Sequence, residues 1–463
     1  MKKFIYKAGL LSIISIGLIS CSQDSLEPEL STERDLNTNP VSSLTDLEYL
    51  ANGMYKRMRA AEYYGRDYII FNEARTDNAY STGNSNRFVT VSEMRVNDSD
   101  AYPADTWLQI YRVIVNANHI INAQNVSGDP DAVNDFKSQA LIVRAICHFD
   151  LMKLFGQQHV SGQGGKNAMT VPYVNVAAAN SSAAVGLSNV RITLDEMRTK
   201  LYQDLDEAIA GITNTSDKTK ITKQAALGYK SRMALYFATF YPEDYQVAYD
   251  AAEAAIAEGG SVIPESAFIS QYSGNVPDVN SVFEFAMPSD DHIGNAGLFE
   301  IYNGNAYGDI VAQTQVMDLY SGADSLDVRK TGLAFDGPDL RNVGKYTAYD
   351  DNVIVMRYEE LLLNAAEAAI QVNPTAALTY INEIRNNRGV AALTSVTIDD
   401  VLLERRKELM FEGFRFDDLM RLQQDIPMNP RITELYPYGH YRIAFPIPVG
   451  EIRASGMQQN HGY

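Results

Sequence analysis

Apolar residues recur every three or four positions over much of this chain, the spacing that places them on one face of an α-helix. In residues 47–61, Leu50, Met54 and Met58 stand four positions apart. The same period predicts further helices over residues 106–123, 140–155, 194–212, 222–240, 245–258, 361–371 and 376–388. We therefore expect a mostly all-α protein whose helices turn their apolar faces toward a shared core.

Two pairs of these predicted helices look like hairpins. A short Pro-containing breaker separates each pair, YPED (241–244) in the first and VNPT (372–375) in the second. Both pairs carry alanines where two helices could approach closely, as at Ala226, Ala252 and Ala366. Helix pairs of about 34 residues with small residues at their contacts resemble tetratricopeptide (TPR) repeats. The sequence thus predicts a TPR-like helical repeat scaffold.

Long segments without helical periodicity interrupt the scaffold at about 63–105 and 259–351. The second is rich in Gly, Asn, Asp, Ser and Tyr and contains one expected strand, SVFEFAM (281–287). Irregular segments of this length inside a folded body often carry function. We expect them to form a loop-rich, ligand-binding subdomain.

These segments place tyrosines beside asparagine, aspartate and arginine. Aromatic rings stack on sugar or peptide, and the polar groups fix hydroxyls or backbone groups of an extended ligand. The alternative is that many of the tyrosines only pin the loops onto the helices. The candidate ligand-binding residues are Arg75, Asp77, Asn78, Tyr80, Asn84, Arg87, Phe88, Tyr272, Tyr302, Asn303 and Tyr307.

Glu404, Glu408 and Glu412 stand four residues apart in ERRKELMFEGFRFDDLMR (404–421), which would place them on one helix face. They could supply a general acid/base pair, or they could belong to a buried charge cluster that fixes how helices dock. Arginines are interleaved with them, and an arginine beside a carboxylate lowers its pKa, the opposite of what a general acid needs. The sequence favours the structural cluster, so we expect no catalytic residues.

No other motif indicates catalysis or a cofactor. The six histidines form no HxxxH or HExxH pattern, and His148 on an apolar helix face is expected to be a core residue. The acidic stretches NDSD (97–100) and DGPD (336–339) could hold Ca²⁺, although solvated loop acids are the favoured interpretation. A net charge of −19 argues against nucleic-acid binding, which requires basic patches.

The chain begins with a basic stretch containing Lys2, Lys3 and Lys7, followed by an apolar run over 8–20 that is too short to span a bilayer. The run ends in LISC, which resembles the bacterial lipobox. By that resemblance residues 1–20 are a signal peptide, and Cys21 would carry a diacylglyceryl group with fatty-acyl chains such as palmitate. Residues 21–40 are acidic and poor in apolar residues, which predicts a flexible tether before a body of residues 41–463.

Beyond these patterns, residues 21–463 resemble the SusD/RagB family of outer-membrane lipoproteins of Bacteroidetes. Two motifs that match the family are LFG (154–156), at the end of a predicted helix, and VP (171–172), after the loop that follows it. The most specific blocks lie near the end of the chain: ERR (404–406), EL (408–409), FEG (411–413), DL (418–419), PIP (446–448) and QN (459–460). Two departures are the long loop between LFG and VP, and His461 where the family usually has proline.

The resemblance implies four TPR-like helix pairs under a loop-rich face, and no active-site chemistry. It also implies a partner: a SusC-like TonB-dependent β-barrel transporter, over which the lipoprotein acts as a lid. The lipoprotein would be lipid-anchored in the outer membrane and would face the cell exterior. The ligand would be an oligosaccharide or an oligopeptide. Since Trp107 is the only tryptophan, the sequence leaves these two open. Alternatives are a TPR-like scaffold lipoprotein without a small ligand, or a membrane-anchored hydrolase.

Overall fold

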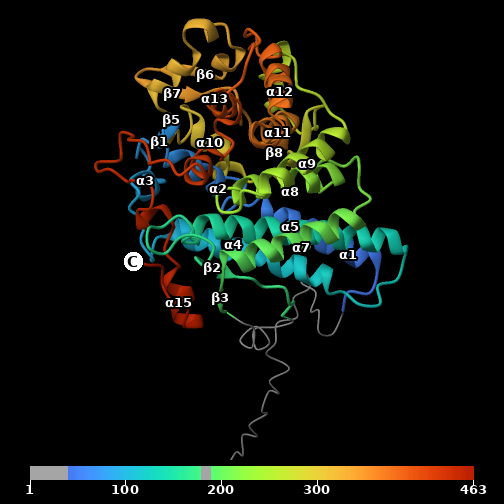
Figure 1. The fold of residues 1–463 in the computed structure, drawn as a ribbon. Helices are drawn as coiled ribbons and strands as arrows, with labels where there is room; N and C mark the ends of the chain where they lie inside the picture. The colour runs from blue at the N-terminus through green and yellow to red at the C-terminus, as the bar shows by residue number, and fades with distance from the viewer. Residues whose placement is uncertain (1–39, 179–188) are drawn as a thin grey trace, which may run out of the picture. The chain divides into compact units, whose positions relative to one another are not determined.

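A continuous series of long helices forms the scaffold in the computed structural model, which describes residues 40–178 and 189–463 (Figure 1). Each helix contacts the next one in the series. This order confirms the predicted mostly α-helical repeat architecture. The helices are α1 (Leu44–Met58), α4 (Ala101–Ile121), α5 (Pro130–Phe155), α7 (Leu194–Gly211), α8 (Lys223–Phe237), α9 (Asp244–Ala257), α11 (Tyr358–Val372) and α12 (Pro374–Asn386).

Side-chain caps set where several of these helices begin. Ser43 and Asp46 form a reciprocal capping box at α1, and Thr193 and Glu196 form another at α7. Helix α5 begins ten residues before the predicted start because Asp129 caps it and a proline occupies its first turn. Its first turns are polar and partly exposed, so they show no apolar stripe in the sequence.

Small residues let the predicted hairpins pack closely. The Ser231 hydroxyl donates to the Ala248 carbonyl at 2.9 Å. The buried alanines of this hairpin are Ala225, Ala226 and Ala234 of α8 and Ala248, Ala251, Ala252 and Ala255 of α9. Gly228 of α8 lies so close to the neighbouring chain that an added Cβ would come within 2.4 Å of the Met356 sulfur. Even alanine at position 228 would therefore require Met356 to move, so only glycine lets α8 approach that segment this closely.

The segment predicted to be irregular over 63–105 is more regular than expected. It contains α2 (Asp67–Ala74), β1 (Ala79–Ser81) and α3 (Val89–Ser92), and α4 already begins at Ala101. All eight residues of α2 are buried. A helix buried on every side has no polar face, so its sequence carries no helical period.

The second irregular segment contains the expected strand, as β4 (Ser281–Phe285), which pairs antiparallel with β8 (Val353–Arg357). A four-stranded sheet, in the order β1–β5–β7–β6, joins the two irregular segments. Two-stranded pairing also occurs between β2 (Met169–Pro172) and β3 (Arg191–Thr193). The second irregular segment also contains α10 (Leu298–Tyr302), β5 (Ile310–Ala312), β6 (Leu333–Asp336) and β7 (Asp339–Asn342). Its short 3₁₀ helices are η2 (Glu265–Ala267), η3 (Ser270–Tyr272), η4 (Gly294–Ala296), η5 (Thr314–Tyr320), η6 (Gly322–Asp324) and η7 (Val328–Gly332).

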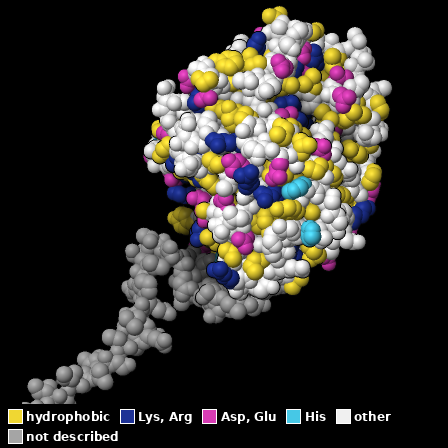
Figure 2. Space-filling model, turned by 90° about the vertical axis from the view of Figure 1, so that its left-hand side faces the viewer, with side chains coloured by type: hydrophobic (Ala, Val, Ile, Leu, Met, Phe, Trp, Pro, Cys, Tyr) yellow, Lys and Arg dark blue, Asp and Glu magenta, His cyan; other side chains and the backbone are white. Residues whose placement is uncertain are grey.

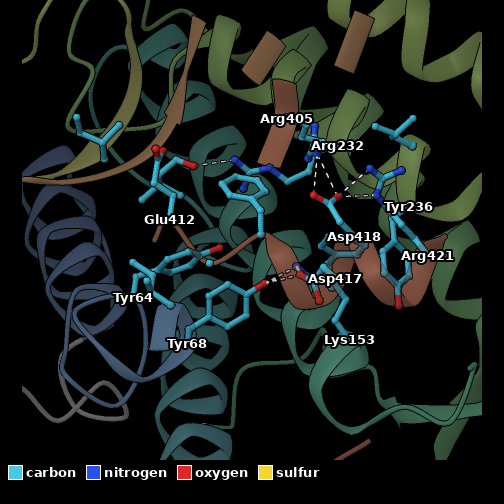
Figure 3. A pocket seen from close by; sticks show the side chains of 17 residues that line it. Tyr64, Tyr68, Lys153, Arg232, Tyr236, Arg405, Glu412, Asp417, Asp418 and Arg421 are labelled. Carbon is cyan, nitrogen blue, oxygen red and sulfur yellow. Dashed lines mark hydrogen bonds and ion pairs between the residues drawn. The ribbon is translucent and has the colours of Figure 1, made fainter. Parts of the chain in front are cut away.

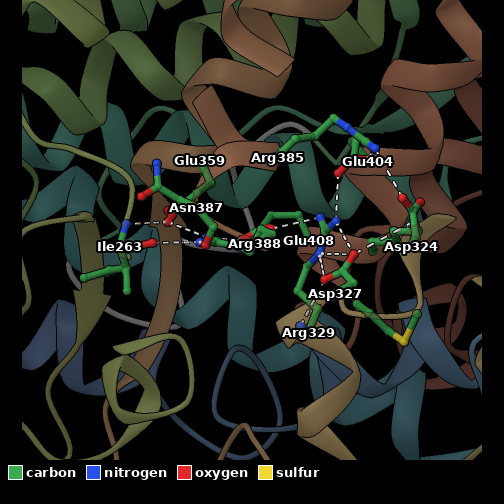
Figure 4. Close-up of polar contacts among 12 residues, drawn as sticks. Ile263, Asp324, Asp327, Arg329, Glu359, Arg385, Asn387, Arg388, Glu404 and Glu408 are labelled. Carbon is green, nitrogen blue, oxygen red and sulfur yellow. Dashed lines mark hydrogen bonds and ion pairs between the residues drawn. The ribbon is translucent and has the colours of Figure 1, made fainter. Parts of the chain in front are cut away.

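Glu404, Glu408 and Glu412 lie in a buried charge cluster, as the sequence favoured. Figure 4 shows Glu404 and Glu408 among their arginine partners. Glu404 and Glu408 belong to α13 (Ile398–Leu409), whereas Glu412 follows its end. Glu408 accepts from Arg357 at 2.7 Å and from Arg388 at 2.8 Å. Burial alone would raise the pKa of Glu408, but these guanidiniums outweigh it and hold the pKa well below its usual value. An ionised, fully paired carboxylate of this kind is unsuited to general acid catalysis.

The partners of this cluster come from distant parts of the chain rather than from the neighbouring arginines. Arg405 and Arg421 instead bind Asp418 of α14 (Arg415–Arg421), and Arg406 binds Asp77. The interleaved arginines therefore dock α13 and α14 onto other elements. The final elements are η8 (Tyr441–Ile443) and α15 (Val449–Ser455).

His148 and its neighbour Cys147 lie in the core. His148 is fully buried; its Nδ1 contacts the Arg144 carbonyl, and the Val174 N–H donates to its Nε2, each at 2.9 Å. Cys147 is also fully buried, and burial raises the pKa of its thiol well above the usual value. His148 is therefore a core residue, as predicted, and Cys147 is buried beside it.

The predicted signal peptide, the lipidation site Cys21 and nearly all of the predicted tether lie outside the described residues. Residues 41–463 form one compact unit. Within the described parts of the chain, no helix is long and apolar enough to cross a membrane.

Candidate functional site

Strand pairing brings the two irregular segments together at one surface. Ala79, Tyr80 and Ser81 of β1 pair with Ala312, Val311 and Ile310 of β5. Just beyond the strands, the Thr82 N–H donates to the Asp309 carbonyl at 2.7 Å, and the Ser85 N–H donates to the Asp309 carboxylate at 3.0 Å. The turn over 82–87 therefore packs against the loop over 303–309. Figure 2 views the side on which these elements lie, where apolar and charged side chains are interspersed.

An arginine–tyrosine pair marks this surface. The Arg87 guanidinium lies 3.8 Å from the centre of the Tyr307 ring, a cation–π contact. The Arg87 side chain keeps 30% of its surface exposed and lies 3.7 Å from the buried Asp309 carboxylate. The carboxylate thus positions the guanidinium over the ring, and both planar groups remain partly open to solvent.

Three other candidates belong to the same paired segments: Tyr80 lies in β1, Asn84 in the turn over 82–87 and Asn303 in the loop over 303–309. Tyr80 and Asn303 are half-buried, and Asn84 is exposed. Burial, and secondarily the charge of Asp339, raises the pKa of Tyr80, so its hydroxyl stays protonated and can donate a hydrogen bond. This small surface therefore offers stacking faces together with hydroxyl and amide groups, which suits a polar ligand.

Two arginines that sequence analysis missed hold this surface in shape. Arg431 donates from Nε to the Ser81 carbonyl at 2.8 Å. Arg341 of β7 donates to the Gly308 carbonyl at 3.1 Å and to the Asp339 carboxylate at 2.8 Å. Both lie far along the chain from the loops they support, so no local pattern could have identified them.

A pocket of about 210 Å³ adjoins the surface. Asn303 and Gly304 form one wall, and Arg341 and Asn342 of β7 form another. Tyr302 and Tyr346, whose rings are nearly parallel with centres 6.0 Å apart, also line it. The pocket is smaller than those that enclose drug-sized molecules, and it suits one end or one ring of an extended ligand.

Five predicted ligand-binding residues are buried, and only Tyr302 among them lines the pocket described above. For the other four, the prediction of surface contact was wrong. The Arg75 guanidinium lies 3.5 Å from the Phe416 ring centre and 4.4 Å from that of Phe445. The Tyr272 hydroxyl lies 3.4 Å from Glu412 in the charge cluster. They serve the core, as the alternative interpretation of the tyrosines allowed. The five are Arg75, Asn78, Phe88, Tyr272 and Tyr302.

Asp77 also has a structural role. Its carboxylate pairs with Arg415 at 2.8 Å and with Arg406 at 2.9 Å. Burial would raise its pKa, but the hydrogen bond and charge of Arg415, with Arg406, lower it overall. Asp77 therefore fastens α13 and α14 to the start of β1, and Tyr80, Asn84, Arg87, Asn303 and Tyr307 remain as the candidate site.

A second hollow, inside the body, is too small to hold a nutrient (Figure 3). Its volume is about 40 Å³, enough for an ordered water. Its charged walls are already paired: Lys153 binds Asp417 at 2.6 Å, and Arg405 binds Asp418 at 3.0 Å. Next to it, Tyr63, Tyr64 and Tyr68 all donate hydrogen bonds to Asp150. This hollow is a structural feature of the core.

The stretches considered for Ca²⁺ have protein partners. Asp336 and Asp339 both pair with Arg341, and Asp100 accepts from the Tyr102 N–H as the cap of α4. Trp107 is buried in α4 against Tyr111 and Phe155. It is therefore a core residue, and the aromatic groups of the candidate surface are tyrosines.

Comparisons with known proteins match two parts of the chain to SusD-type family models. Residues 28–235 match a SusD-like family described as starch-binding and associating with the outer membrane, and residues 339–463 match the SusD family. The chain is 25% identical to the SusD-like protein P2 of Formosa agariphila, over 91% of each chain. It is 21% identical to a SusD-like protein of Bacteroides ovatus, over 92% of this chain and 84% of the relative.

Solved structures agree with this assignment. A putative sugar-binding protein from Bacteroides vulgatus superposes with a TM-score of 0.82 at 26% identity, covering 93% of this chain and all of that one. A SusD superfamily protein from Bacteroides thetaiotaomicron superposes with a TM-score of 0.80 at 25% identity, covering 90% and 99%. With the helical scaffold, the joined loop segments and these matches in view, the chain belongs to the SusD/RagB family.

Proposed function

We propose that this protein is a cell-surface lipoprotein that captures an oligosaccharide for uptake. The observation that carries the proposal is the partly exposed Arg87–Tyr307 pair, flanked by Tyr80, Asn84 and Asn303. Aromatic faces stack on the apolar faces of sugar rings, and amide and guanidinium groups bind hydroxyls. The carboxylate of Asp309 at this surface is buried, accepts from the Ser85 hydroxyl and lies 3.7 Å from Arg87, an arrangement that supports binding rather than hydrolysis.

The family favours a glycan over a peptide as the ligand. The matching family model is described as starch-binding, and one structural relative is described as a sugar-binding protein. The surface itself would also accept an oligopeptide, because rings and amides bind peptide groups as well. We therefore propose an oligosaccharide and treat an oligopeptide as the competing outcome of the binding test.

We further propose that Cys21 carries the lipid anchor and that the protein acts as a lid on a SusC-like TonB-dependent β-barrel transporter. Family membership and the basic, apolar and LISC segments before Cys21 support this part. The acidic stretch after Cys21 would then act as a tether that lets the lid move while the lipid stays in the outer membrane. The helical scaffold would hold the transporter, and the loop surface would hold the nutrient.

Binding to a panel of oligosaccharides and oligopeptides tests the ligand site. Tyr307→Ala removes the ring beneath Arg87 and should weaken binding about tenfold, as expected for the loss of roughly 1.4 kcal/mol of stacking. Tyr49→Ala is the matched control, because Tyr49 is 70% exposed on α1, outside the candidate surface. Equal affinities for the two variants would contradict the proposed site, and binding of peptides alone would replace the glycan.

A pull-down of the tagged protein from outer membranes in mild detergent tests the partner. Mass spectrometry should find a large β-barrel transporter, and Cys21→Ala should remove the protein from the membrane fraction. A tagged protein that comes down without a barrel would favour the scaffold interpretation, while binding of the ligand panel would still test the surface independently.

A further inference from the structure

A larger hollow lies away from the candidate surface, beside β2 and β3 and the chain that follows α15 (Figure 1). Its volume is about 710 Å³, within the range of pockets that enclose small organic ligands. Gln157, Gln163, Gln458 and His461 are among the described residues that line it. None of these described lining residues is acidic, although the chain has 58 acidic and only 39 basic residues.

The charge in this hollow comes from Arg191 at the start of β3. Arg191 is only 7% exposed. It donates to the carbonyls of Thr170, Met169 and Gln458 at 2.6, 3.1 and 3.2 Å, and to the Asn460 amide oxygen at 2.7 Å. All four acceptors are neutral, so four of the five guanidinium N–H groups are used, and no carboxylate among the described residues 40–178 and 189–463 forms an ion pair with Arg191.

This arrangement differs from that of the other buried arginines. Arg357 and Arg388 each contact carboxylates in the charge cluster. Arg75 lacks a carboxylate, but two aromatic rings enclose its guanidinium. Arg191 instead lies at the wall of an open hollow, and burial lowers its pKa to about 10. A buried charge without a partner is costly, and a bound anion would offset that cost.

A second donor lacks a partner in the same hollow. Gln157, which follows the end of α5, is only 5% exposed, and its side-chain Nε2 makes no hydrogen bond. Buried amide donors are almost always satisfied, so an orphan at the wall of a hollow indicates a missing acceptor. This amide nitrogen is itself sealed from solvent, so a ligand would reach it only after the Gln157 side chain turns, and the unpaired charge of Arg191 is the main attraction that the wall offers to an anion.

We propose that this hollow is a second binding site, for a small polar molecule that carries a carboxylate. The carboxylate would bind Arg191 and Gln157, and the amide side chains of Gln163 and Gln458 would bind hydroxyl or amide groups elsewhere on the ligand. Two kinds of molecule share this chemistry, sugar acids and acidic amino acids. The site is separate from the Arg87–Tyr307 surface, so its occupancy does not depend on the function proposed above.

Calorimetric titration at neutral pH tests the proposal with matched acid and neutral probes: galacturonate against galactose, and glutamate against glutamine. We expect at least one acid to bind ten times more tightly than its neutral analogue. The tighter acid identifies the source of the carboxylate. Equal affinities within both pairs, or no binding of either acid, would overturn the proposal.

Gln163→Glu places a carboxylate in the wall at an exposed position, so it tests the site without threatening the fold. It should weaken binding of the acid about tenfold through like-charge repulsion. Asn167→Asp is the control, because it adds the same charge to the same exposed loop at a position that does not line the hollow. Equal effects of the two variants would overturn the site, whereas Tyr307→Ala should leave acid binding unchanged.

Discussion

Replacing Glu408 by glutamine tests whether the buried charge cluster is structural. Glu408 is fully buried and contacts Arg357 at 2.7 Å, Arg388 at 2.8 Å and Arg329 at 3.2 Å. Glutamine keeps the shape but removes the negative charge between these guanidiniums. Removing one partner of a buried ion pair costs about 3–5 kcal/mol, because the remaining charge is left uncompensated.

The expected shift in melting temperature follows from the size of the folded body. A per-residue unfolding entropy of about 2 cal/mol/K over residues 41–463 gives roughly 0.9 kcal/mol/K. A loss of about 3–5 kcal/mol should therefore lower Tm by roughly 3–6 °C. Differential scanning calorimetry measures this directly, with Glu207→Gln as the control because Glu207 is exposed on α7.

The pH dependence of the Tm difference between wild type and Glu408→Gln gives a second measurement. The folded protein holds the pKa of Glu408 below its unfolded value of about 4.3. The carboxylate therefore contributes its full stability above that value and loses it only as the pH falls through the lower, folded pKa. The Tm gap between wild type and Glu408→Gln should stay constant from pH 8 to about pH 5. A Tm change no larger than that of Glu207→Gln would refute the structural interpretation of the cluster.

Three further measurements probe the site and the core. Arg87→Ala should weaken ligand binding and leave Tm nearly unchanged. Tyr302→Ala should lower Tm, because the Tyr302 side chain is only 1% exposed. If Tyr302→Ala weakened ligand binding without lowering Tm, its placement in the core would be contradicted. Gly413→Ala should lower the free energy of unfolding, measured by urea denaturation, by about 1–2 kcal/mol, because Gly413 has φ +84° and an added Cβ would lie 3.0 Å from Ile69 Cα. Gly162→Ala is the control: Gly162 has φ +75° but lies in open space, so this variant measures the backbone strain alone. The imidazole of His148 should remain neutral in NMR titrations down to pH 5, because burial lowers its pKa to about 3. The unfolded imidazole titrates near 6.5, so its protonation on unfolding should reduce the stability of the folded protein as the pH falls below that value. A His148 signal that titrates near 6.5 would contradict its burial.

The helical scaffold could be predicted from the sequence because its helices have one apolar face each. Helix α2 could not, since it is buried on all sides and lacks a polar face. Its burial also explains why Arg75, which directly follows α2, was mistaken for a ligand-binding residue. Composition alone cannot tell an arginine between two core rings from one on a surface.

The candidate site shows the same limit. The sequence pointed to two loop segments, and pairing of β1 with β5 brings the chain that carries Tyr80, Asn84 and Arg87 beside the loop that carries Asn303 and Tyr307. That these residues bind a ligand stays a prediction. Which tyrosines face solvent depends on strand pairing between distant segments, which no local pattern encodes. The supporting contacts of Arg341 and Arg431 depend on the same long-range pairing.

The pairing of β1 with β5 also bears on when this protein becomes functional as it folds. It joins residue 79 to residue 312, whereas the helix hairpins join neighbours in the chain. Contacts between distant residues carry a larger loop-closure entropy and form slowly compared with local ones. We therefore expect the helical stack to form first and the sheet last. Recovery of ligand binding during refolding should then lag behind recovery of helical circular dichroism, so binding would report the final step of folding.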